Sequence, residues 1–388
     1  MTSDELVTNV HQQVVDWRRH LHQNPELSFH EQDTAMFVQE TLESVSGLDV
    51  TRPTATSVMA RLRTGRPGKV LAIRADMDAL PIQEENQFEF RSQRPGAMHA
   101  CGHDAHTAML LGTAKVLSAM ADQLSGEVRF IFQHAEELFP GGADEMIQAG
   151  VMDGVDLVIG AHVWAPLEVG KIGIVYGPAM AAPDTFWITI HGTGGHAAMP
   201  HQTVDPIVVG AQVVSGLQHI VSRAVDPLST VVVSVTQFVA GTTHNVIPGS
   251  AQMQGTVRSF DPELRESVPA LMERFVKGIT HAHGATYELK YEQGYRVVHN
   301  ESTVTALVED TVREVLGEAA IDTMKPTMGG EDFSAFQERA PGCFFFVGAG
   351  NPTKGIVHPH HHPRFTIDED ALDIGVRVFV HIAARALT

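Results

Sequence analysis

In the stretch Phe130-Ile131-Phe132-Gln133-His134-Ala135-Glu136-Glu137-Leu138, an apolar run leads into two adjacent carboxylates. An apolar run without polar alternation is typical of a strand that is buried on both faces. Similar runs occur at 58–62, 70–75, 157–159 and 343–347. Helical periodicity marks other stretches, at 6–21, 107–120, 303–316 and 370–386. The sequence therefore predicts an α/β fold whose sheet has helices on both faces.

The middle of the chain has a different order of elements. Between residues 186 and 291 the patterns predict strand, helix, strand, strand, helix and strand. This β-α-β-β-α-β order is that of a ferredoxin-like unit. A Pro-, Ala- and Gly-rich stretch at 177–183 precedes it and is typical of a linker. We expect a discontinuous α/β domain, 1–183 and 296–388, with a smaller α+β domain inserted at 184–295 and suited to self-association.

The composition excludes several classes of protein. The chain has 388 residues, of which 43% are hydrophobic, as expected for a folded protein of two domains. With 27 Lys and Arg against 46 Asp and Glu, the net charge of −19 argues against nucleic acid or an anionic membrane as partner. Two cysteines cannot form a disulfide framework, and no signal peptide or spanning segment is visible. We therefore expect a cytoplasmic protein.

Histidine is unusually frequent, with 22 residues, and the densest group is Met98-His99-Ala100-Cys101-Gly102-His103-Asp104-Ala105-His106. Thiolate and imidazole donors suit a transition-metal ion such as Zn, Co, Ni or Mn. The alternative is a polar loop with incidental histidines. The density of donors favours a metal site.

Glu136 and Glu137 follow the apolar run 130–132 directly. Successive side chains at the end of a strand point in different directions. One carboxylate can therefore bind a metal ion while its neighbour acts as general base, which is the division of labour that metal-assisted hydrolysis requires. A solvent-exposed pair of glutamates is the alternative for this stretch taken alone.

Further candidates follow other apolar runs or lie in a stiffened loop. Asp76 and Asp78 follow the run 70–75, and His162 follows the run 157–159. A cluster of four histidines at 358–362 is interrupted by Pro359 and followed by Pro363. Prolines stiffen a loop, which favours the presentation of ligands. The sequence contains no HExxH, GxSxG, Walker or GxGxxG motif, so zincin, serine-hydrolase and nucleotide-binding functions have no support.

Seven motifs, read in order, resemble the M20 metallopeptidase family: MHACGHDAH, FQHAEE, GAHVW, GTGGHAAMP, NVIPGS, MGGEDFS and HHPRF. The resemblance covers nearly the whole chain and is to the amidohydrolase branch, with its hippurate hydrolases, N-acyl-amino-acid amidohydrolases and plant auxin-conjugate hydrolases. It implies a zinc-exopeptidase-like catalytic domain with two divalent metal ions (Mn, Zn, Co or Ni) and an inserted lid and dimerisation domain. The implied reaction is hydrolysis of N-acyl amino acids by a homodimer or tetramer.

The resemblance also implies roles for residues of the catalytic domain. The metal ligands would be Cys101, His103, Glu137, His162 and His361, with Cys101 as the bridge between the ions. Glu136 would be the general base, and Asp78 would orient a ligand. His358, His360 and His362 remain alternatives to His361.

In the inserted domain, three residues match the family's substrate-binding positions. His196 would cross a dimer to polarise the scissile carbonyl, and Asn245 and Arg258 would hold the carboxylate of the substrate. A guanidinium suits that task because it binds a carboxylate through two parallel hydrogen bonds.

Two departures from the family pattern bear on the site. The stretch Asp76-Met77-Asp78 stands where the wider family has His-x-Asp, so His103 would replace the missing ligand. His134 stands where most relatives have proline, and Leu138-Phe139-Pro140 stands where they have glycines. A dipeptidase or carboxypeptidase with the same site is the rival enzyme. A catalytically silent binding relative and a structural zinc protein are the non-enzymatic alternatives.

Overall fold

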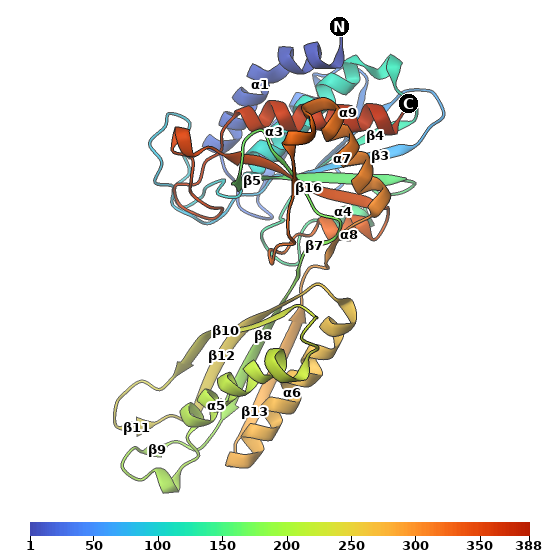
Figure 1. The fold of residues 1–388 in the computed structure, drawn as a ribbon. Coiled ribbons are helices and arrows are strands. Elements are labelled where there is room, and N and C mark those ends of the chain that lie inside the picture. Colours follow the sequence, from blue (N-terminus) through green and yellow to red (C-terminus); the bar gives the residue numbers. More distant parts are fainter. The chain divides into compact units, whose positions relative to one another are not determined.

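The computed structural model describes residues 1–388 as two compact units (Figure 1). Unit 1 contains Met1–Ala179, Val298–Pro326 and Asp332–Thr388. Unit 2 contains Met180–Val297 and Thr327–Glu331. Unit 2 is thus formed mainly by one continuous segment that interrupts unit 1. No helix is long and apolar enough to span a membrane.

An eight-stranded mixed sheet forms the centre of unit 1. In spatial order its strands are β1 (Leu48–Thr51), β2 (Val58–Arg63), β4 (Glu127–Gln133), β3 (Val70–Asp76), β5 (Leu157–Glu168), β16 (Gly342–Gly350), β6 (Ile172–Ile174) and β15 (Ile321–Thr323). The central strands β4, β3, β5 and β16 run parallel to one another. Their carboxyl ends therefore lie at one edge of the sheet, which is where open α/β sheets place their sites. The predicted α/β fold class is confirmed.

Helices cover both faces of this sheet (Figure 1). On one side, α1 (Ser3–Gln23), α3 (His103–Ala119) and α9 (Asp370–Ala386) pack against one another, with α2 (Gln32–Glu43) against α3 and α7 (Ser302–Leu316) against α9. The short helices α4 (Ala143–Gln148) and α8 (Phe333–Gln337) pack together on the other side. Because it lies between the sheet and other helices, α3 is buried around most of its circumference.

Three expectations from the sequence are wrong in detail. Helix α3 begins at His103 instead of 107, because Gly102 adopts φ +98° and lets the chain enter the helix directly after Cys101. Strand β5 continues to Glu168, so His162 lies inside the strand. The stretch 177–183 contains the boundary between the two units, as a linker would, but it is not irregular: it forms β7 (Gly177–Met180), which pairs with β14 (Val298–Asn300), and the start of β8.

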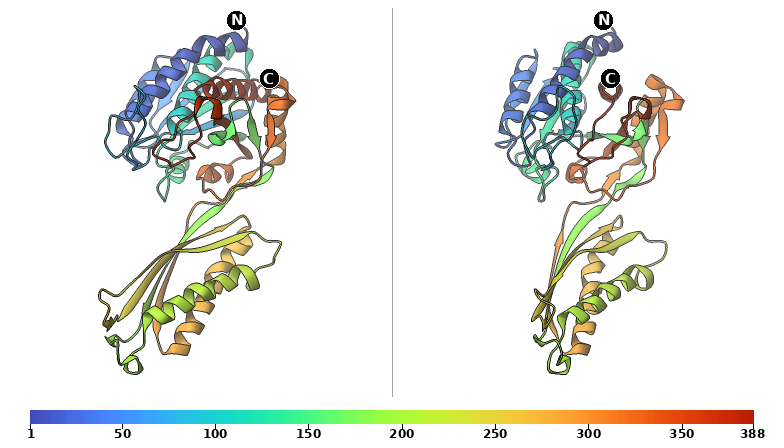
Figure 2. Two further views of the ribbon diagram at one scale, coloured as in Figure 1. Left: turned by 60° about the vertical axis from the view of Figure 1, so that its left-hand side comes forward. Right: turned by 90° about the vertical axis from the view of Figure 1, so that its left-hand side faces the viewer.

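Unit 2 has the predicted β-α-β-β-α-β order. Its elements are β8 (Ala182–His191), α5 (Pro206–His219), β10 (Val231–Ala240), β12 (Ser250–Ser259), α6 (Pro262–His283) and β13 (Thr286–Gln293), with a short pair β9 (Gly195–His196) and β11 (Val246–Ile247). The antiparallel sheet has the order β10-β12-β8-β13. Both helices lie on one face of it (Figure 2). Phe186, Ile188 and Ile190 alternate along β8 and contribute to the core of the unit.

A buried ion-pair network fixes the start of α3 relative to α1. Arg18 donates from Nε to Oδ2 of Asp104 at 2.8 Å, and both side chains are 1% exposed. The same carboxylate oxygen lies 2.8 Å from Nδ1 of the buried His22. Asp104 immediately follows His103, so this network helps to hold one of the predicted metal ligands in place.

We predict that Arg18→Met destabilises the protein by about 3–5 kcal/mol, because it leaves the buried Asp104 without its main cation. Arg19→Met is the matched control. Arg19 is 44% exposed and pairs with Glu369 near the surface, so its loss is expected to cost less than about 1 kcal/mol. Equilibrium urea denaturation measures both changes. Equal effects of the two variants would contradict the role assigned to the Arg18–Asp104 pair.

Candidate metal centre

Four segments of unit 1 bring the predicted ligands together. Donor atoms of Cys101, His103 and His162 all lie within 4.8 Å of one another, and so do those of Cys101, Glu137 and His361. Cys101 therefore belongs to both donor groups. The arrangement offers two neighbouring cation positions that share one sulfur atom.

The donor atoms fit metal ions because the protein leaves some of them without hydrogen bonds. Nε2 of His103 and Oε1 of Glu137 are buried and make no hydrogen bond. Oε1 of Glu137 lies 3.3 Å from Nε2 of His361 and 3.9 Å from Nε2 of His103. Buried polar atoms are normally satisfied. Convergent nitrogen, oxygen and sulfur donors of this kind suit divalent transition metals.

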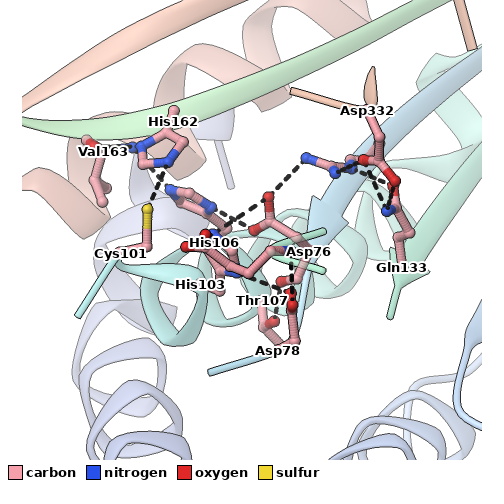
Figure 3. Close-up of polar contacts among 12 residues, drawn as sticks. Asp76, Asp78, Cys101, His103, His106, Thr107, Gln133, His162, Val163 and Asp332 are labelled. Carbon is pink, nitrogen blue, oxygen red and sulfur yellow. Dashed lines mark hydrogen bonds and ion pairs between the residues drawn. The ribbon is translucent and has the colours of Figure 1, made fainter. Parts of the chain in front are cut away.

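Asp78 orients two of these residues at once. Its Oδ1 lies 3.1 Å from Nδ1 of His103, which leaves Nε2 directed to the donor group (Figure 3). Its Oδ2 accepts hydrogen bonds from the backbone N–H of Glu137 at 2.9 Å and from the hydroxyl of Ser28 at 2.7 Å. A carboxylate behind a ligating histidine fixes the ring and raises its basicity.

His106 is close to the donor groups, but both of its nitrogens are engaged. Nδ1 lies 2.6 Å from Oδ1 of Asp76, and Nε2 accepts from the backbone N–H of Val163 at 2.8 Å (Figure 3). The other oxygen of Asp76 accepts from Nη1 of Arg74 at 2.7 Å. His106, on α3, therefore connects Asp76 at the end of β3 to Val163 on β5. The oxygens of Asp76 already have these partners.

His162 faces Cys101 from β5. Its Nδ1 donates to the carbonyl oxygen of Val163 at 2.6 Å, and its Nε2 lies 3.3 Å from Sγ of Cys101. Burial and the neighbouring His106 and His360 hold the pKa of His162 well below its ordinary value. The ring is therefore neutral, which is the form that binds metal ions.

The histidine cluster places one of its four members at the donor groups. His361 adopts φ +65° and donates its backbone N–H to the carbonyl of Ala100 at 2.9 Å. His360 instead accepts the N–H of Ala165 at 3.1 Å with its Nε2. The rings of His358 and His362 stack on each other with centroids 4.3 Å apart. This arrangement favours His361 among the alternatives.

The electrostatics of the site favour bound cations. Burial opposes a charged His103, yet Asp76, Asp78 and Glu137 outweigh it and raise the pKa of this imidazole to about 10. Burial, together with Glu137 and Glu136, raises the pKa of the Cys101 thiol well above its ordinary value. Both pKa values are raised by negative charge concentrated in a buried place. A bound metal ion would lower both pKa values, because it binds the thiolate and the neutral imidazole.

Glu136 and His134 point to different surroundings. Glu136 is 7% exposed, and one of its oxygens lies within 4.8 Å of donor atoms of His103 and Glu137. His134 is buried on α4's side, with Nε2 3.0 Å from Oε2 of Glu145. The two residues after Glu137, Leu138 and Phe139, are 54% and 53% exposed. Glu136 is therefore the second carboxylate at the donor groups.

The three candidates in unit 2 do not form one group. His196, on β9, faces Val246 in the register of β11, and the backbone carbonyl of the adjacent Asn245 accepts from Ala197 at 3.2 Å. Arg258 lies eight residues beyond Ser250 on β12, roughly 27 Å along the strand at about 3.4 Å per residue. Its Nε donates to Thr256 at 3.2 Å. Within one chain, His196 and Asn245 are thus far from Arg258.

Sequence reasoning missed two contributors from the N-terminal segment, Ser28 and Glu31. Ser28 donates to Asp78, and Oε1 of Glu31 accepts the backbone N–H of Ala135 at 2.7 Å. Both residues lie between α1 and α2, in a stretch without periodicity or a metal-binding motif. The feature that distinguishes Glu31 is that its carboxyl group is buried in an irregular segment. Burial of this kind cannot be read from the sequence.

Comparison with known proteins agrees with this geometry. Residues 72–385 match the model of peptidase family M20/M25/M40. An N-acyl-L-amino acid amidohydrolase of Geobacillus stearothermophilus is 68% identical over 303 residues, 77% of this chain and 82% of that protein. Thermostable carboxypeptidase 2 of Saccharolobus solfataricus is 42% identical over 390 residues, 98% of each chain.

A solved structure gives the same result. The YXEP protein of Bacillus subtilis, a dinuclear metal binding peptidase from the M20 family, is 39% identical and superposes with a TM-score of 0.85 over 98% of this chain and 99% of that chain. The resemblance inferred from the sequence motifs is thereby confirmed: the chain is a hydrolase that belongs to peptidase family M20/M25/M40.

Proposed function

We propose that this hydrolase cleaves the amide bond of N-acyl amino acids to a carboxylic acid and an amino acid, with two divalent metal ions and in the cytoplasm. The main support for the proposal is that two donor groups share Cys101 and that a further carboxylate, Glu136, lies beside them. The similarity to an N-acyl-L-amino acid amidohydrolase supports the choice of substrate. Mn, Zn, Co and Ni all suit the mixed donor set.

The chemistry divides between the cations and the protein. Two divalent cations at the donor groups would polarise the amide carbonyl and lower the pKa of a bound water towards about 7. Glu136 accepts the proton of the attacking water and returns it to the leaving nitrogen, so that each turnover restores its carboxylate. Asp78 holds the ring of His103 and the peptide of Glu137 while this occurs.

His196, Asn245 and Arg258 are proposed to complete the site across a dimer. His196 and Asn245 lie at the end of unit 2 that contains β9 and β11, whereas Arg258 lies near the other end of β12. A substrate carboxylate and a scissile carbonyl are only a few ångströms apart. If all three residues contact one substrate, they must therefore come from two copies of the chain.

A carboxypeptidase or dipeptidase activity is the second candidate, and the similarity to a thermostable carboxypeptidase favours it. A hydrolysis screen separates the two candidates. Acetyl-, benzoyl- and indoleacyl-amino acids are expected to be cleaved with Mn, Co, Ni or Zn, whereas turnover of dipeptides alone would establish the rival activity.

Glu136→Gln is expected to abolish turnover while two metal ions remain bound, because the amide cannot accept a proton but leaves the donor groups intact. Steady-state kinetics and metal analysis of the same preparation measure both properties. Substantial activity of the fully loaded variant would show that another group is the base.

His196→Asn is expected to lose about 10²–10³-fold in kcat through loss of one oxyanion donor. Mixing this protein with Glu136→Gln, followed by subunit exchange, should restore activity, because one kind of mixed site then contains both intact residues. An exchange that is verified by mass spectrometry but restores no activity would argue against a site shared between subunits.

Cys101→Ala is expected to lower the metal content well below two ions per chain, since this thiol belongs to both donor groups. His361→Ala removes a donor from one group only, so about one ion should remain. Cys343→Ala is the matched control, because Cys343 is buried within β16 and belongs to neither group. Inductively coupled plasma mass spectrometry gives the stoichiometry. Two ions retained in Cys101→Ala would contradict a shared thiol.

A further inference from the structure

Glu31 is a buried carboxyl group that the proposed reaction does not use. It is fully buried, directly before α2, and its side chain does not cap that helix. Its Oε1 instead accepts the backbone N–H of Ala135 at 2.7 Å. Burying a carboxyl group is unfavourable unless specific interactions compensate for it. A specific function of Glu31 in the segment that it contacts would account for its burial.

Ala135 has an unusual backbone conformation. Its φ is +50°, in the left-handed region that non-glycine residues rarely adopt, and it is completely buried. This conformation is unfavourable for an L-residue because Cβ approaches the carbonyl oxygen. It persists where the surroundings hold it, and such residues cluster at functional sites. Ala135 directly precedes Glu136, so its backbone angles set the direction in which the next residue leaves the chain.

Two buried carboxyl groups bind the backbone N–H groups of the residues on either side of Glu136. Glu31 accepts the N–H of Ala135, and Asp78 accepts the N–H of Glu137 at 2.9 Å. The carbonyl of Ala135 is also engaged, since it accepts the N–H of Gly142 at 3.1 Å. The backbone around Glu136 is therefore fixed on both sides by groups that lie far away in the sequence.

We infer that Glu31 is a positioning residue for the general base: by binding the Ala135 peptide it holds Ala135 in the left-handed conformation and thereby aims the carboxylate of Glu136. The inference rests on the proposed role of Glu136. Asp78 orients ligands on one side of Glu136, whereas Glu31 orients the base from the other side. Glu31 itself belongs to none of the groups of possible metal ligands.

The test uses the full-length, metal-loaded enzyme with acetyl- and benzoyl-amino acids as substrates. Glu31→Met retains most of the side-chain volume but removes the acceptor, and it should lower kcat by about 10²-fold with KM within about threefold of the wild-type value. Glu31→Gln retains an acceptor oxygen. Burial and the nearby Asp78 raise the pKa of Glu31 to about 8, so the neutral amide resembles the protonated carboxyl present at pH 7. We expect Glu31→Gln to retain kcat within about tenfold.

Ala135→Gly provides a second, independent test of the inference. Glycine adopts positive φ without penalty, so the loop no longer needs Glu31 to hold it. In the Glu31→Met background, Ala135→Gly should raise kcat on the order of tenfold, the factor expected from relief of one left-handed residue. In the wild-type background it should change kcat by less than about threefold. This non-additivity is specific to the inferred coupling.

Glu26→Ala is the matched control. Glu26 is a buried carboxylate of the same segment, 7% exposed, but its oxygens bind the backbone N–H of Thr34 and the guanidinium of Arg94. Its loss should reduce stability without lowering kcat. Amide hydrogen exchange adds a readout that does not need activity: the Ala135 amide should exchange faster in Glu31→Met and remain protected in Glu26→Ala.

Three results would overturn the inference: kcat of the loaded Glu31→Met variant within twofold of wild type, equal effects of Ala135→Gly in both backgrounds, or unchanged protection of the Ala135 amide. If Glu31→Met does not fold, Glu31→Asp, which withdraws the acceptor by one methylene, takes its place with the same expectations. An inactive wild-type enzyme would refute the proposed function alone, because the exchange experiment still decides whether Glu31 holds Ala135.

Discussion

The arrangement of unit 1 depends on one thiol that faces two sets of donors. Cys101 can do so because the chain turns sharply between it and His103, at Gly102. A Cβ at this position would lie 2.3 Å from a methyl group of Val163, and φ is +98°, so no other residue fits without rearrangement. The tight turn lets helix α3 begin at His103 and points its imidazole and the Cys101 thiol into the same buried volume.

Carboxyl groups surround the shared thiol. Glu137 and Glu136 belong to the donor groups. Three aspartates bind neighbouring side chains instead: Asp78 binds His103, Asp76 binds His106, and Asp104 binds Arg18. Buried carboxylates repel one another, and the histidines and arginines between them only partly offset this repulsion. Two divalent cations would supply the missing positive charge. Metal binding is therefore expected to stabilise the folded chain.

Much of this could be predicted from local patterns, and the rest depended on long-range contacts. The apolar runs gave the central strands, and the order of elements gave the fold of unit 2, because both follow from periodicity. The start of α3 was predicted four residues late, since the effect of Gly102 depends on its backbone angle. His361 was chosen from its motif, but its separation from His360 and His362 depends on which ring finds a backbone partner. Glu31 was missed, because it acts through a peptide 104 residues away.

A crystal structure of the metal-loaded enzyme, with anomalous scattering recorded at the absorption edge of the bound metal, tests whether Cys101 is shared. The shared-thiol arrangement predicts two ions about 3.5–4 Å apart, with Sγ of Cys101 bound to both, His103 and His162 on one ion, and Glu137 and His361 on the other. A single ion, or two separate ions with Cys101 bound to only one of them, would contradict it.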